Sequence, residues 1–80
     1  MKPIDFEGAD IVFGENQPAY LPLPAKQVDK NTIMTCWELT DEDILLINSS
    51  KKILLGIKTF GKPLQPVLLA SSRSDIDGQI

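Results

Sequence analysis

The chain has 80 residues, of which 42% are hydrophobic and 24% are charged, the composition of one small globular domain. One cysteine and no histidine exclude an intrachain disulfide and leave a structural zinc site without a ligand set. The net charge of −3, with eight basic residues scattered along the chain, argues against duplex nucleic acid as a partner.

So short a chain buries only about 60–65% of the surface that its unfolded form exposes. Disulfides, metals and self-association are the usual means of stabilising such a domain, and the composition leaves self-association, so we expect a homo-oligomer. The N-terminus lacks the apolar core of a signal peptide, and the longest apolar run is too short to cross a bilayer. We therefore expect no membrane contact and a cytoplasmic location.

The first third of the chain predicts little regular structure. Residues 11–13 (IVF) are typical of a short strand, and Gly14 favours a turn after it. Residues 14–31 contain Pro18, Pro22 and Pro24, which disfavour a helix or a central strand. We interpret 14–31 as a proline-rich extended arm lying on a protein surface; the alternative is a mobile linker anchored by Tyr20.

A strand and a capped helix follow. Residues 33–38 alternate and are rich in strand-forming residues. Thr40 can cap a helix that begins at Asp41 and ends near Asn48 or Ser49, with Asp43 completing a capping box. Four consecutive apolar residues, 44–47, cover more of its circumference than one packed face requires, which again indicates a second contact, with the proline-rich arm or another subunit.

The last part of the chain predicts a β-hairpin. Residues 52–60 form the first strand, 61–63 the turn and 66–71 the returning strand, and one face of the first strand should pack beneath the helix. We therefore predict one α+β domain, residues 1–71, with a small antiparallel sheet of three to four strands and one short helix on one face. Residues 72–80 should form a frayed tail.

The residues do not predict catalysis. Cys36 has no candidate base beside it, and it is interpreted as a small buried apolar residue. The carboxylates of Asp41, Glu42 and Asp43 are explained by the start of the helix. We expect a protein that is not an enzyme, with no catalytic residues, no metal and no cofactor.

Aromatic residues with polar neighbours indicate a binding site instead. An aromatic ring that stacks on a base, with lysine or glutamine to meet phosphate or base edges, suits a nucleotide-sized ligand. The candidate ligand-binding residues are Tyr20, Trp37, Lys58, Thr59, Phe60, Lys62 and Gln65. The alternative is that Trp37 and Phe60 belong to the core or to a subunit interface.

Several sequence blocks together resemble a group of small proteins of tailed bacteriophages and prophages, over roughly residues 6–70. The blocks are FEGA at 6–9, YLPLP at 20–24, CWEL at 36–39 and TFGKPLQP at 59–66. No catalytic residues are carried over to this chain from the resemblance. The resemblance is compatible with a phage protein that disarms bacterial immunity in the host cytoplasm.

Three functional hypotheses follow. The first is an anti-defence protein that sequesters a small cyclic or ADP-ribose-type nucleotide signal at subunit interfaces. The second is a non-enzymatic interaction module that binds a host or virion protein through the proline-rich arm or a sheet edge. The third, a weak nucleotide-directed enzyme, ranks last because no general base is evident.

Overall fold

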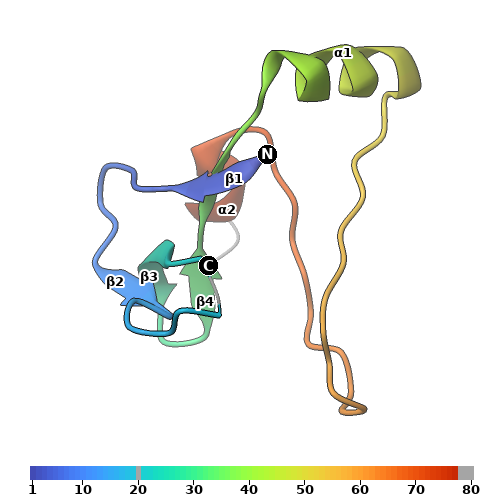
Figure 1. Ribbon diagram of the computed structural model, residues 1–80. Coiled ribbons are helices and arrows are strands. Elements are labelled where there is room, and N and C mark those ends of the chain that lie inside the picture. The colour runs from blue at the N-terminus through green and yellow to red at the C-terminus, as the bar shows by residue number, and fades with distance from the viewer. Residues whose placement is uncertain (20, 78–80) are drawn as a thin grey trace.

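The computed structural model describes residues 1–19 and 21–77 and shows an α+β protein with two small antiparallel sheets and a helix of ten residues. Figure 1 shows the strands gathered on one side, with helix α1 and a long loop extending beyond them. The α+β class predicted from the sequence is confirmed.

The first sheet joins the start of the chain to its middle. Strand β1 (Lys2–Ile4) pairs antiparallel with β5 (Cys36–Glu38), so that Lys2 lies opposite Glu38 and Ile4 opposite Cys36. The thiol of Cys36 is free, and the residue is half-buried rather than fully buried.

The second sheet has the order β2–β3–β4, with strands Ile11–Phe13, Leu23–Asp29 and Thr32–Met34. The strand predicted at 11–13 is therefore confirmed, and Gly14 after it has a positive φ of 71°. The single strand predicted at 33–38 is instead two strands, β4 and β5, which are interrupted at Thr35 and belong to different sheets.

The central strand β3 corrects the prediction that residues 14–31 contain no central strand. It tolerates Pro24 because of the register. The Asp10 N–H donates to the Ala25 carbonyl at 2.9 Å, and the Gln27 N–H donates to the Asp10 carboxylate at 3.0 Å. The backbone polar groups of Ala25 and Gln27 therefore face the β2 side. Alternation turns Pro24 toward the β4 side, where pairing ends at Lys26–Met34, and its missing N–H therefore breaks no ladder bond.

The core of this protein is small. Among the described residues, the buried apolar side chains are Ala25, at 0% exposure, and Met34, at 5%. Both lie in the β3–β4 hairpin. Ala25 is paired with Ile11 of β2, and Met34 is paired with Lys26 of β3. So little buried apolar surface gives one protomer a narrow stability margin.

A tight turn at residues 6–9 joins the part of the chain that holds both sheets, residues 1–38, here called the body, to the C-terminal helix α2 (Arg73–Asp77). The Ala9 N–H donates to the Phe6 carbonyl at 3.1 Å, and Gly8 has φ +91°, a value that favours glycine at this turn position. The Arg73 guanidinium lies 5.7 Å from the centre of the Phe6 ring, within cation–π range. Residues 73–77 thus form a docked helical turn where a frayed tail is predicted, and 78–80 lie outside the described residues.

Helix α1 (Asp41–Ser50) begins and ends with regular caps. The Thr40 hydroxyl accepts from the Asp43 N–H at 3.0 Å, and the Asp43 carboxylate accepts from the Thr40 N–H at 2.9 Å. The predicted capping box and helix are therefore confirmed, the helix extending to Ser50. However, none of its ten residues is buried.

Candidate functional site

Residues 51–72, here called the outer loop, leave α1, run outward to a turn and return to α2 (Figure 1). The turn spans Thr59 to Lys62, whose N–H donates to the Thr59 carbonyl at 3.0 Å. Phe60 and Gly61 between them have φ of 54° and 79°. Two positive φ values at the central positions are the mark of a type I′ turn, the commonest connection in two-residue β-hairpins.

The two legs of the outer loop do not form the strands predicted at 52–60 and 66–71. Residues 51–72 contain no strand, and the turn is centred on Phe60 and Gly61 rather than spanning the predicted 61–63. The apolar residues of both legs are exposed: Ile53, Leu54, Leu55, Ile57, Leu64, Val67, Leu68 and Leu69. The predicted packing of the first leg beneath α1 is therefore wrong for one protomer, because that leg is not buried.

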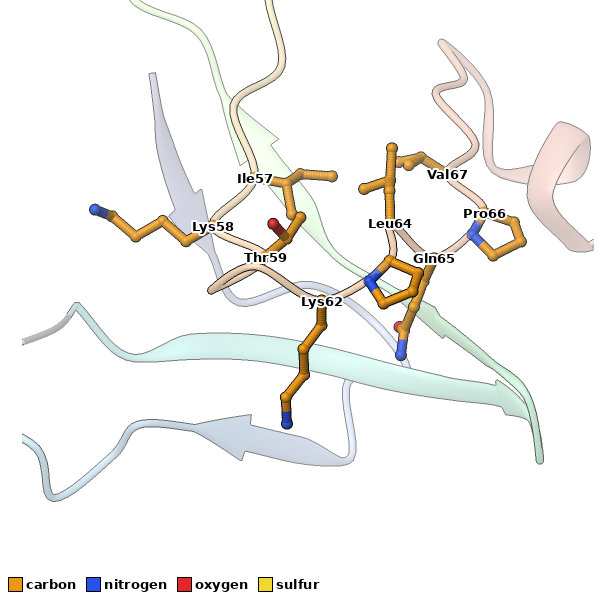
Figure 2. A pocket seen from close by; sticks show the side chains of 9 residues that line it. Ile57, Lys58, Thr59, Lys62, Leu64, Gln65, Pro66 and Val67 are labelled. Carbon is orange, nitrogen blue, oxygen red and sulfur yellow. The ribbon is translucent and has the colours of Figure 1, made fainter.

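An open hollow of about 370 Å³ lies between the legs near the turn. Four of the predicted ligand-binding residues line it: Lys58, Thr59, Lys62 and Gln65. Figure 2 shows the Lys62 and Gln65 side chains extending toward the same side, while Lys58 extends away from them. The rest of the wall is apolar or proline, including Ile57, Leu64 and Val67.

The predicted aromatic residues do not line this hollow. Phe60 occupies the turn itself and is 83% exposed. Trp37 belongs to β5, is 49% exposed, and donates its indole N–H to the Thr35 hydroxyl at 3.0 Å. The alternative that Trp37 and Phe60 belong to a core is thus wrong for one protomer, since both rings are exposed. Tyr20 lies outside the described residues.

A second hollow, of about 440 Å³, lies beside α1 and was not predicted. Its apolar wall comes from the helix and the first leg, through Leu46, Ile47, Ile53 and Leu54. Met1 and Asp43 lie at its margin. The run of four apolar residues at 44–47 is the sequence signal for this surface, since a helix apolar on most of its circumference requires more than one contact.

The Asp43 carboxylate is the charged group most altered by its surroundings. It lies 2.8 Å from the N-terminal ammonium of Met1. This bond, followed by those to the backbone and side chain of Thr40, lowers the pKa of Asp43 from 3.8 to about 2. The carboxylate therefore stays ionised and holds the N-terminus against the start of α1.

Charge is divided between two parts of the chain. Residues 1–43 hold nine of the eleven acidic residues and three of the eight basic ones, whereas residues 51–72 hold four lysines and no acidic residue. The body and the start of α1 are thus acidic, and the outer loop is basic. An anionic group near the turn would meet no carboxylate of the same loop.

In the part of the chain that the structure describes, no three His, Cys, Asp or Glu side chains are grouped so that they could hold a metal ion. Over the same residues, no helix has the length and apolar character that a membrane crossing requires. Comparison with family models, with curated proteins and with solved structures finds no match.

Proposed function

We propose that this protein is a non-enzymatic binding protein that sequesters a small nucleotide-type anion at the turn of the outer loop. The observation that carries this proposal is the gathering of Lys58, Thr59, Lys62 and Gln65 around one hollow, on a loop without acidic residues. Lysine provides a point charge for phosphate, and the glutamine amide provides both donors and an acceptor for a base edge.

The size and shape of the hollow suit one wall of such a site. A volume of about 370 Å³ is near the lower end for small-molecule sites. The exposed Phe60 ring beside it can stack on a base, as aromatic residues do for every nucleobase. Because the hollow is open, one protomer supplies one wall of the site, and we place the complete site at a subunit interface.

The phage resemblance supports a biological role for this binding. A phage protein that holds a cyclic or ADP-ribose-type nucleotide would withdraw an alarm signal from bacterial immunity. We place that activity in the cytoplasm of the host bacterium, where such signals are made and read.

Titration calorimetry with cyclic dinucleotides, cyclic trinucleotides and cyclic ADP-ribose isomers tests the proposal. We expect heat from at least one ligand at tens of micromolar, and a loss of affinity of about tenfold or more in Lys62→Ala and Gln65→Ala, from one charge-assisted or amide hydrogen bond each. Lys30→Ala, on the β3–β4 turn, is the matched control and should bind normally. No heat from any ligand in the panel would contradict the proposal.

The exposed apolar legs favour a second candidate function, a module that binds a host or virion protein. An extended segment with free backbone groups can add to the sheet edge of another protein. Affinity capture from infected cells distinguishes the two functions. A stoichiometric protein partner, with no small molecule released on denaturation, supports the module, whereas a released nucleotide supports sequestration.

A further inference from the structure

The surface of this chain is too large for a protomer that stays alone. Its accessible surface is 6922 Å², whereas a folded monomer of 8.8 kDa is expected to expose about 4,800 Å². Its radius of gyration is 13.9 Å, against about 11.6 Å for a compact domain of this length. The excess surface is therefore roughly 2,100 Å² per copy.

This excess falls within the range of surface that each partner of an obligate homodimer covers. Obligate interfaces bury about 2,000–5,000 Å² in total, or about 1,000–2,500 Å² from each partner. Most of the exposed large apolar side chains lie on the outer loop and α1, on both legs and on the helix, and the others are spread over the strands and the turns between them. A binding partner that covered this excess would therefore lie on the outer loop and α1.

Both halves of a complementary contact are present on every copy. The outer loop is apolar and carries Lys51, Lys52, Lys58 and Lys62 without an acidic residue. Helix α1 is apolar along 44–47, begins with Asp41 and Glu42, and borders an apolar hollow. A surface whose basic half fits its own acidic half is self-complementary, as a two-fold interface must be.

We propose that the occupant is a second copy of this chain, and that the two copies exchange outer loops reciprocally, each loop lying against helix α1 of the other. The contact predicted between the first leg and the helix is then made between copies rather than within one. Exchange of an element that a short chain leaves extended is a common route to dimers. The type I′ turn fixes the loop as a two-legged unit before it docks.

The first test is the mass in solution by light scattering. Wild-type protein at tens of micromolar should have twice the chain mass of 8.8 kDa. Leu55→Asp and Leu68→Asp, one on each leg, should each give a monomer. Leu21→Asp is the matched control, because Leu21 is 73% exposed and lies outside the outer loop and α1. A monomeric or larger wild-type protein, or loss of the dimer in the control, overturns the proposal.

The second test shows where the two copies touch. Unlike the first test, it does not use variants that disrupt the dimer. Two populations are prepared in a Cys36→Ser background, one with Leu46→Cys on α1 and one with Leu55→Cys on the first leg. Because the two thiols lie on different chains, a disulfide between them reports a loop-to-helix contact between copies. We expect a covalent heterodimer when the two populations are unfolded, mixed, refolded together and oxidised. A dimer that never yields it overturns the exchange.

The proposal and the nucleotide site can fail separately. The mass and the cross-link are measured without ligand, so a dimer that gives no heat with nucleotides overturns only sequestration. A monomer that binds a nucleotide overturns the exchange and the placement of the site at a subunit interface, but not sequestration itself.

Discussion

The N-terminal ammonium of Met1 and the carboxylate of Asp43 lie 2.8 Å apart, and this contact ties the first strand to the first turn of helix α1. Asp43 also accepts from the Thr40 N–H, so one carboxylate joins the N-terminus, the cap and the helix. Helix α1 has no buried residue, so these polar bonds link it to the N-terminus without support from a buried apolar face.

Acid should release this contact. The folded-state pKa of Asp43 is about 2, below its ordinary value of 3.8. The unfolded chain therefore binds this proton more readily, and the stabilisation is complete above about pH 4 and is lost as the pH falls toward about 2. The amide resonances of Thr40 and Asp43 should move over that range.

Asp43→Asn should abolish this pH response, and Glu42→Gln, in the same helical turn, should leave it in place. Acetylation of the N-terminus should shift the midpoint upward toward 3.8, because it removes the ammonium whose hydrogen bond contributes most to the lowered pKa of Asp43. An unchanged response in Asp43→Asn would show that another group is responsible.

The turn at Gly8 should not accept a side chain. Its φ is +91°, and an added Cβ would lie 2.7 Å from a terminal nitrogen of Arg73. We expect Gly8→Ala to lower the free energy of unfolding by about 1–2 kcal/mol, mainly through the left-handed backbone. Denaturant unfolding measures this.

Gly56→Ala is the matched control, since a Cβ there meets nothing within 4 Å and the backbone has no positive φ. That substitution should be neutral or slightly stabilising. Equal losses in the two variants would contradict the role given to the Gly8 turn.

The core should respond to the loss of a single side chain. Met34 is 5% exposed, and Met34→Ala should lower the free energy of unfolding by about 2 kcal/mol or more. Ile33→Ala, next to it on β4 but 40% exposed, should cost clearly less. Thermal unfolding of the two variants compares them, and a reversed order would contradict the assignment of the core.

A substitution at the turn residue Phe60 can test nucleotide binding without changing the turn. Phe60 has a positive φ, which asparagine adopts more readily, so Phe60→Asn should preserve the type I′ turn. If Phe60 stacks on a base, the same substitution should weaken nucleotide binding about 5- to 150-fold, the equivalent of about 1–3 kcal/mol. Calorimetry with the best ligand of the panel measures the change, and unaltered affinity would exclude the stack.

Local signals in the sequence predicted local structure well. The capping box at Thr40 and Asp43 and the turn after Phe13 depend on residues within three or four positions of each other, and both are present. Lys58 and Gln65 line one hollow because both flank the same turn, whereas the aromatic residues predicted to share a site with them do not line it; their role in binding stays a prediction.

Features set by distant partners were not predictable in this way. Pro24 is compatible with a central strand only because β4 pairing stops before it, and no local pattern carries that register. The legs of the outer loop have the composition of strands, but a strand requires a neighbour. Alternation at 33–38 likewise does not show that Thr35 divides two sheets.

The pairing of Lys2 with Glu38 determines when the two sheets can form during translation. The body closes only when β5 has left the ribosome, yet it needs nothing that follows Glu38 to form both sheets. During translation, the body can therefore fold as a unit before the outer loop emerges. A newly made chain would then have a folded body before its outer loop is free to contact another copy.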